Sequence, residues 1–214
     1  IPSEHVSVPN PDLHELEKYR LLLRHFGLRP EIDLPKISLA RDDRPRSSDG
    51  RPTNLRIVLA VGTVNPIKEY PRWPDVVTAL KKKLSPEWVL IGGQSEKVPP
   101  ELLPVLPSKT RDLRGKTTLE ELAREIAAAD LFLGVDTGPA HLALALGKSA
   151  VVVLGGGDYG RFFPYGHARV VTHRLDCFQC HWECRYERAL CLQDISPASV
   201  CAEVEQAWKG SRVN

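Results

Sequence analysis

The chain has no methionine among its 214 residues, and it begins with Ile1. Since translation starts at methionine, we expect the natural start, and with it a whole domain, to lie upstream. No apolar run approaches the roughly 20 residues that a membrane-spanning helix needs. The first residues also lack the order of charged, apolar and small residues that marks a signal peptide. These absences predict a cytoplasmic fragment without a membrane-spanning helix.

The chain also lacks an excess of charge of either sign. Its 29 Lys and Arg residues against 27 Asp and Glu residues give a net charge of +2. A balance this even gives no electrostatic footprint for nucleic acid, so we expect no nucleic-acid partner and any anion site must be built locally. The hydrophobic fraction of 42% is enough for a buried core.

The first 54 residues differ from the rest. Apolar residues at helical spacing predict an amphipathic helix over 12–26, with Gly27 as its cap. Residues 41–52 are rich in Arg, Asp, Ser, Pro and Gly, which is typical of an exposed linker. We therefore expect residues 1–54 to be an interdomain helix and linker, the tail of a missing N-terminal domain, and residues 55–214 to form one domain.

Within that domain, apolar runs of strand length alternate with amphipathic runs of helix length. The predicted strands are 55–61, 88–91, 131–135, 150–154 and 169–172. The predicted helices are 73–84, 119–129, 140–146 and 198–208. Such alternation predicts an α/β fold, a Rossmann-like doubly wound parallel sheet with helices on both faces. Sheets of this kind bind ligands beyond the carboxyl ends of their strands.

The segment Val135 to Leu142, sequence VDTGPAHL, links a predicted buried strand to a predicted helix. Thr137 can cap the helix, Gly138 lets a ligand approach the backbone, and Pro139 suits the first turn. Free N–H groups at the start of a helix favour an anion, so a diphosphate fits this segment. A plain capped helix, with Asp136 as a second capping acid, explains the same residues equally well from local chemistry alone.

Two other loops follow predicted strands. Lys68, in the loop after the first strand, is able to reach a phosphate, and Glu96, in the loop 92–96, is able to bind ribose hydroxyls. Ordinary solvated side chains are the competing interpretation for both. Lys68 gains support because it shares a sheet edge with the Asp136 loop, since the carboxyl ends of parallel strands lie together.

A third loop offers an alternative. Residues 155–160 match the dinucleotide pattern G-x-G-x-x-G after a predicted strand, and Asp176 lies near the spacing of a ribose-binding acid. This pattern would indicate an NAD(P)-dependent oxidoreductase. However, residues 161–166 should open a helix, and they contain a proline, aromatic residues and a glycine, which start helices poorly. We rank this alternative below the Asp136 segment.

Taken together, these loops resemble glycosyltransferase family nine, the ADP-heptose:lipopolysaccharide heptosyltransferases and their relatives. That family has a D-[ST]-G-x-x-H stretch, which stands here as residues 136–141. It also has a K-x-W-like segment, which Lys68 and Trp73 resemble with wider spacing. Three further segments are similar to family patterns: 14–19, 92–96 and 113–119. The resemblance covers nearly the whole chain.

The resemblance implies the C-terminal, donor-binding domain of a type B glycosyltransferase fold, with the catalytic base in the N-terminal domain. It implies transfer of a sugar, heptose by default, from an ADP-sugar to a lipopolysaccharide-type acceptor, either a glycolipid or an oligosaccharide. The fragment alone is then expected to be inactive, and the whole protein to work in the cytoplasm, at the inner face of the inner membrane. A non-catalytic module that binds nucleotide sugars is the remaining alternative.

By the same resemblance, Lys68 neutralises the donor phosphates, Glu96 holds the ribose, and Asp136 contacts the sugar. The full set of implied donor-binding residues is Lys68, Glu96, Thr117, Asp136, Thr137, Gly138 and His141. The chain has no D-x-D motif, so we expect no cofactor to be required for catalysis. The implied mechanism is inverting transfer, in which a base deprotonates the acceptor hydroxyl and Lys68 and the helix end stabilise the departing nucleoside diphosphate.

Four of the five cysteines lie close together near the end of the chain. Cys177, Cys180, Cys184 and Cys191 have the spacing of a metal knuckle, and four thiolates suit a tetrahedral structural zinc. Reduced thiols are the competing interpretation, and disulfides are disfavoured in a reducing cytoplasm. We expect Cys201, in the last predicted helix, to lie in the core.

Overall fold

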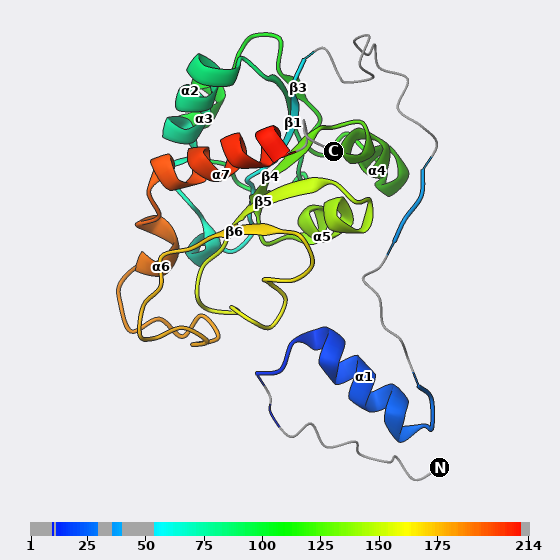
Figure 1. The fold of residues 1–214 in the computed structure, drawn as a ribbon. Coiled ribbons are helices and arrows are strands. Elements are labelled where there is room, and N and C mark those ends of the chain that lie inside the picture. The colour runs from blue at the N-terminus through cyan, green and yellow to red at the C-terminus, as the bar shows by residue number, and fades with distance from the viewer. Residues whose placement is uncertain (1–9, 11, 30–35, 40–53, 211–214) are drawn as a thin grey trace.

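The computed structural model describes residues 10, 12–29, 36–39 and 54–210 (Figure 1). Its six-stranded sheet has the order β3-β2-β1-β4-β5-β6, and every neighbouring pair is parallel. The strands are β1 (Arg56–Ala60), β2 (Glu87–Leu90), β3 (Arg111–Asp112), β4 (Leu131–Val135), β5 (Ser149–Val153) and β6 (Arg169–Val171). This order is that of a doubly wound nucleotide-binding sheet, so the predicted fold class is confirmed.

Helices cover both faces of the sheet, as Figure 1 shows. The helices are α1 (Glu15–His25), the 3₁₀ helix η1 (Pro66–Lys68), α2 (Trp73–Leu84), α3 (Leu102–Val105), α4 (Leu119–Ala127), α5 (Gly138–Ala145), α6 (Leu190–Gln193) and α7 (Pro197–Gly210). Apolar residues from α2, α3, α6 and α7 form one buried cluster, and those from α4 and α5 form the other. Each face of the sheet therefore has its own core.

The central strand β1 shows how the sequence produces this arrangement. Leu59 lies in the cluster beneath α2 and α7, whereas its neighbour Val58 lies in the cluster beneath α4 and α5, and both are fully buried. Successive side chains of a strand point to opposite faces, so a strand covered on both sides must be apolar throughout. The continuous apolar runs of β1, β4 and β5 follow from this requirement.

The reversal of strand order falls between β1 and β4, since the chain winds outward from β1 to β3 and then returns to β4. Ligands of doubly wound sheets bind at this switch point, beyond the carboxyl ends of the strands. The loops that begin at Gly62 and Asp136 follow β1 and β4 directly and therefore flank it. Both are loops that the sequence singles out.

Helix α1 lies beside the sheet domain in Figure 1 and contacts it at its amino end. The Glu15 N–H donates to the Arg161 carbonyl at 2.9 Å, and Arg161 Nε donates to Glu15 Oε1 at 2.8 Å. His14 Nε2 lies 3.1 Å from the Phe162 carbonyl oxygen. No residue of α1 is buried. The predicted helix is confirmed, whereas the predicted linker lies outside the described residues and the domain boundary at 54 stays a prediction.

Two further predictions concern the place of Cys201 and the absence of a membrane-spanning helix. Cys201 of α7 is buried, and its thiol donates to the Val76 carbonyl at 3.8 Å, so its expected place in the core is confirmed. No helix in the described part of the chain is both long and apolar enough to cross a membrane.

Candidate functional site

The loops at the switch point bring Lys68 and Asp136 to one small cavity. Thr63, Gly155 and Trp182 also line it. Lys68 comes from η1 after β1, and Asp136 follows β4, so the two side chains reach the cavity from opposite sides of the strand-order reversal. The predicted sharing of a sheet edge is therefore observed, with a cation and an acid facing one hollow.

Asp136 is held by the first turn of the helix that follows it. Its side chain is 15% exposed, and its Oδ1 lies 3.3 Å from His141 Nε2. The other ring nitrogen of His141 lies 2.8 Å from the Tyr165 hydroxyl, and the His141 ring stacks on Phe163 with centroids 4.5 Å apart. The His141 ring is thus fixed at both nitrogens and on its face.

Tyr165 completes this group. Burial, and then the charge of Asp136, raise the pKa of Tyr165 to about 12. The hydroxyl therefore keeps its proton at neutral pH and is available as a donor to His141. The sequence places Tyr165 in the weak helix start after the glycine-rich loop, and nothing in its local pattern indicates a contact with residues 136–141.

The amino end of α5 is open. Thr137 occupies the N-cap position, but its side chain makes no capping hydrogen bond, and its Oγ1 lies 3.4 Å from the Val135 carbonyl oxygen instead. The predicted capping role of Thr137 is therefore wrong, because the hydroxyl turns back toward β4. Gly138 is exposed, and a Cβ placed on it would meet nothing within 4 Å. The first turn of α5 consequently faces open space without a side-chain cap.

Lys68 is not the solvated surface lysine of the competing interpretation. Its Nζ lies 3.1 Å from Asp158 Oδ2 and 4.8 Å from the centroid of the Trp182 ring. Asp158 is 9% exposed and is the one charged residue of the described chain that counts as buried. Burial acts to raise the pKa of Asp158, but hydrogen bonds from Trp182 and Lys68 outweigh it, so the pKa is lowered. Asp158 is therefore a carboxylate at neutral pH.

Glu96 lies one strand further along the sheet edge. Its carboxylate occupies the space beside Gly62 and Gly92, where a Cβ on either glycine would come within 2.7 Å of Glu96 Oε2. Burial raises the pKa of Glu96, and a backbone hydrogen bond from Gly93 opposes that shift. Glu96 thus joins the loops after β1 and β2, but it does not line the cavity of Lys68 and Asp136.

Thr117 also stands apart from that cavity. It is partly buried and directly precedes Thr118, the N-cap of α4. Thr118 and Glu121 form a capping box: the Glu121 N–H donates to Thr118 Oγ1 at 3.2 Å, and the Thr118 N–H donates to Glu121 Oε2 at 2.7 Å. Helix α4 is therefore capped without Thr117, whose side chain has no such structural task.

The glycine-rich loop 155–160 is covered rather than open. A Cβ on Gly157 would lie 2.4 Å from the Trp182 ring, and a Cβ on Gly156 would lie 2.4 Å from the Phe178 ring. No helix follows this loop directly, and Asp176 pairs with Arg185 at 2.7 Å on the surface. The space that a pyrophosphate would need is filled by aromatic rings, so the structure does not favour the oxidoreductase alternative.

Those rings belong to the cysteine-rich loop, defined here as residues 173–192. All five cysteines of the chain are free thiols. Burial, followed by the neighbouring thiols, raises the pKa of Cys184. Burial also raises the pKa of Cys191, against the opposing hydrogen bond that the Gly156 N–H donates to its Sγ at 3.2 Å. Among the described residues, however, no three His, Cys, Asp or Glu side chains are arranged to hold a metal ion. The thiols are neighbours without forming a ligand set, and the zinc site stays a prediction.

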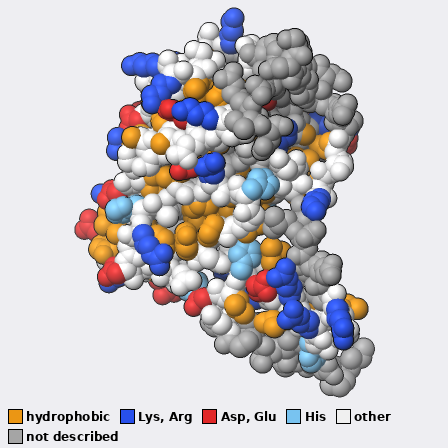
Figure 2. All heavy atoms as spheres, viewed as in Figure 1, with side chains coloured by type: hydrophobic (Ala, Val, Ile, Leu, Met, Phe, Trp, Pro, Cys, Tyr) orange, Lys and Arg blue, Asp and Glu red, His pale blue; other side chains and the backbone are white. Residues whose placement is uncertain are grey.

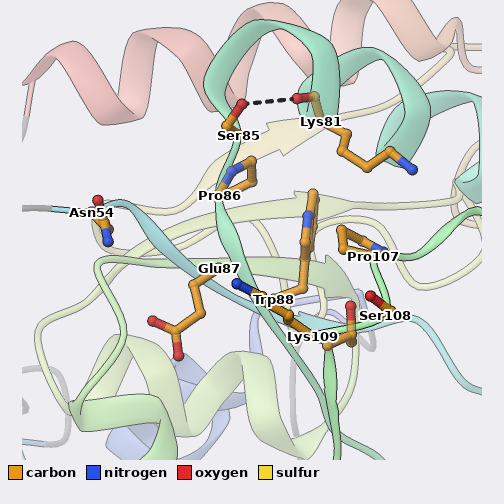
Figure 3. A pocket seen from close by; sticks show the side chains of 10 residues that line it. Asn54, Lys81, Ser85, Pro86, Glu87, Trp88, Pro107, Ser108 and Lys109 are labelled. Atoms are coloured by element: carbon orange, nitrogen blue, oxygen red, sulfur yellow. Dashed lines mark hydrogen bonds between the residues drawn. The ribbon is translucent and has the colours of Figure 1, made fainter.

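A second hollow opens at the amino ends of the strands, away from these residues (Figure 3). Lys81, Glu87, Trp88 and Lys109 are among its lining residues. Lys81 Nζ already donates to the Val105 carbonyl at 2.7 Å, and the Trp88 indole N–H is sealed from solvent without a partner. This hollow lies at the sheet edge that doubly wound folds do not use for ligands.

The face that carries the loop after β5 is apolar in its middle. Figure 2 shows hydrophobic side chains gathered there, between the sheet domain and α1. Tyr19 of α1 and Phe26, the C-cap residue that follows the helix, are exposed by 58% and 63%. Helix α1 therefore exposes apolar side chains beside its charged ones.

Comparison with known proteins identifies relatives of the whole arrangement. The model of "Glycosyltransferase family 9 (heptosyltransferase)" matches residues 2–190. Lipooligosaccharide heptosyltransferase 2 of Campylobacter jejuni is 29% identical over 108 residues, which make up 49% of this chain and 34% of that protein. The chain thus spans about a third of the length of the curated relatives it matches.

Two solved structures share the fold. The ADP-heptose lipopolysaccharide heptosyltransferase II of E. coli is 21% identical, with a TM-score of 0.61 over 99% of this chain and 56% of the other. The dodecameric iron-containing heptosyltransferase TibC of enterotoxigenic E. coli, in complex with ADP-D-beta-D-heptose, is 18% identical, with a TM-score of 0.62 over 80% of this chain and 49% of the other.

Proposed function

Because the chain belongs to glycosyltransferase family 9, we propose that it supplies the donor site of a glycosyltransferase that moves a sugar, heptose by default, from an ADP-sugar to a lipopolysaccharide-type acceptor. One observation carries the proposal. The Lys68 ammonium and the Asp136 carboxylate line a single cavity at the switch point of a doubly wound sheet, next to the uncapped first turn of α5.

Each side chain has a role that fits its chemistry. The free N–H groups at the start of α5, around Thr137 and Gly138, donate to the diphosphate oxygens, and the helix dipole adds positive potential there. Lys68 neutralises the phosphate charge from the opposite wall. Asp136, held by His141, contacts hydroxyls of the donor sugar.

Glu96 and Thr117 serve the nucleoside in this proposal. The Glu96 carboxylate lies one strand from the switch point, where acids of dinucleotide folds bind ribose hydroxyls. Thr117 precedes the capped start of α4 with its hydroxyl unused by the cap, so it is available to a ligand. The two residues extend the site along the sheet edge, beyond the phosphate cavity.

The transfer inverts the anomeric centre. A base from the N-terminal half deprotonates the acceptor hydroxyl, and Lys68 together with the α5 amino end stabilises the departing nucleoside diphosphate. These groups supply the positive charge that the leaving group needs, so donor binding requires no divalent cation. The expected result is an ADP affinity that does not change when EDTA replaces Mg²⁺.

The acceptor, a glycolipid or an oligosaccharide, binds mainly to the N-terminal half in this proposal. The exposed Tyr19 and Leu22 of α1, with Phe26 at its C-cap, support an interdomain role for that helix, because a second domain would bury them. We also propose that the protein works in the cytoplasm, at the inner face of the inner membrane when the acceptor is a lipid.

Isothermal titration of the chain with ADP and with ADP-heptose tests the proposal. Lys68→Ala should weaken both ligands by roughly 10- to 100-fold, since a hydrogen bond to a charged group contributes about 1.5–3 kcal/mol. Asp136→Ala should weaken ADP-heptose more than ADP, because its partner is the sugar. Lys83→Ala is the matched control, since Lys83 pairs with Glu205 away from the site. Unchanged affinities in both site variants, or a preference for NAD, would overturn the assignment.

A further inference from the structure

The ammonium group of Lys68 is fixed by two residues that sequence patterns do not connect to it. Asp158 Oδ2 lies 3.1 Å from Lys68 Nζ and accepts a hydrogen bond from Trp182 Nε1 at 2.6 Å. The Trp182 ring also lies beneath the ammonium, 4.8 Å from centroid to Nζ. Three side chains from three separate loops therefore meet at one point.

Asp158 is well suited to hold a cation in a fixed place. Only 10% of its side chain is exposed, and Arg161 Nη1 lies 3.8 Å from its other oxygen. A buried carboxylate needs partners, and here they are Trp182, Lys68 and, more distantly, Arg161. Because Trp182 and Lys68 bind the same oxygen, the indole N–H fixes the orientation of the carboxylate that the lysine meets.

Trp182 is held in place at the expense of backbone strain. It has a φ of 66°, and His181 before it has a φ of 51°, in the left-handed region that bulky residues avoid. The glycine-rich loop holds this segment: the His181 N–H donates to the Gly157 carbonyl at 2.9 Å. The indole then fills the space above Gly155 and Gly157. Strain that the surroundings enforce is typical of positions where a side chain must be placed accurately.

We propose that Asp158 and Trp182 are positioning residues for Lys68, holding its ammonium group at the wall of the cavity that Asp136 also lines. The inference rests on the proposed donor site and adds to it the cysteine-rich loop, which brings Trp182. An ammonium group has three N–H donors, so Lys68 is able to keep Asp158 and still bind a phosphate oxygen. A flexible lysine that is already ordered loses less entropy when the diphosphate arrives.

The variant Asp158→Asn separates positioning from charge. The amide oxygen still accepts from Trp182, but the ion pair with Lys68 is lost. Removing a negative charge near the cavity would by itself favour an anion, so weaker ADP binding must come from the loss of positioning. We expect the affinity for ADP to fall roughly tenfold, the scale of one charge-assisted contact. Affinity that is unchanged or higher would overturn the proposal.

A double-mutant cycle of ADP affinities distinguishes positioning of Lys68 from a general structural role of Asp158. In a Lys68→Ala background, Asp158→Asn should leave ADP affinity unchanged or raise it, because only the repulsion is removed. An equal loss in both backgrounds would mean general distortion of the site and would overturn the proposal. Trp182→Phe keeps the ring above the glycines and removes the N–H, so a smaller loss of the same sign is expected.

Glu205→Gln is the control, because Glu205 also pairs with a lysine, Lys83, at 2.7 Å away from the cavity. Thermal unfolding of each variant reports whether it folds, and Trp182→Phe tests the proposal if Asp158→Asn does not fold. Failure of the wild-type chain to bind ADP or ADP-heptose would reject the proposed function. Wild-type binding with an indifferent Asp158→Asn would reject the positioning role alone.

Discussion

Two glycine-containing loops leave neighbouring strands at the same edge of the sheet, yet they are filled in opposite ways. Gly138, after β4, has nothing within 4 Å of the position that a Cβ would take. Gly156 and Gly157, after β5, have aromatic rings within 2.4 Å of theirs. The first loop is open to a ligand, and the second is closed by the protein itself.

The difference shows what a glycine in a loop reports. A glycine in a loop indicates that some group packs close to the backbone. That group is as easily an indole ring of the protein as a phosphate of a ligand. The rings over Gly156 and Gly157 come from Phe178 and Trp182, about twenty residues further along the chain. The six-residue glycine pattern of 155–160 contains no information about which group will pack against it.

The largest effect that we predict from this difference between the two loops is a loss of stability in a variant of the closed loop. Gly157→Ala places a methyl group 2.4 Å from the Trp182 ring, in a segment that the cysteine-rich loop already crowds. Overpacking of this kind costs about 1–3 kcal/mol, so the free energy of unfolding should fall by that amount. Urea unfolding followed by circular dichroism measures it.

Gly138→Ala is the control for that experiment, because its methyl group meets no neighbour and its backbone does not need a positive φ. Its free energy of unfolding should stay close to that of the wild type. Equal destabilisation by the two substitutions would contradict the distinction between a closed and an open loop.

The second prediction uses the same substitution for binding. In the proposed site the diphosphate lies against the first turn of α5, so a methyl group on Gly138 should weaken ADP binding by roughly tenfold while stability is retained. Titration calorimetry on the folded variant measures this. ADP affinity equal to that of the wild type would show that the phosphate does not approach the backbone there.

Sequence patterns cover only short stretches of the chain, and this limits how much of the fold and the site they predict. The strands β1, β4 and β5 are predicted from short apolar runs and the helix α2 from its amphipathic pattern. Both signals are local, and all four elements are found where they are predicted. The short β3, α3 and α6 have too few residues to show a period.

Local patterns of this kind do not predict which side chains of different loops contact one another. Asp136 and Lys68 are predicted from their place after strands, because parallel strands bring their carboxyl ends together. The attachment of Lys68 to Asp158 and of His141 to Tyr165 depends on how the loop after β5 folds back. The orientation of the Thr137 hydroxyl is likewise set by local geometry that a preference for capping residues does not contain.

The third prediction concerns the cysteine-rich loop, whose Phe178 and Trp182 rings lie over Gly156 and Gly157, and what holds that loop in place. If Cys177, Cys180, Cys184 and Cys191 bind zinc, purified protein contains about one zinc per chain, since one tetrahedral ion uses four thiolates. Removing it with a chelator should then lower the thermal midpoint and, through Trp182, the affinity for ADP. If they are reduced thiols, no zinc is present and a thiol reagent titrates them. Cys201→Ser is the control, because Cys201 lies in α7, outside the cluster.

The smallest effect comes from a second pair of glycines, Gly62 and Gly92, and here the group close to the backbone is the Glu96 carboxylate. Burial raises the pKa of Glu96 above its ordinary value of 4.5. Between that value and the raised one, the folded chain keeps a proton that the unfolded chain has released. The free energy of unfolding attributable to Glu96 therefore falls as pH rises through this window, and the cost is complete above it.

Glu96→Gln removes that dependence, because an amide does not titrate. The variant should be slightly more stable than the wild type at neutral pH. The difference should shrink as pH falls through this window and be lost below 4.5, where Glu96 is protonated in both states. Urea unfolding at several pH values measures it, with the exposed Glu101→Gln correcting for the change in net charge. A gain that is the same at every pH would show that burial of the charge is not the cause. If Glu96 also binds the ribose, the same variant should bind ADP more weakly, so this position would trade stability for ligand affinity.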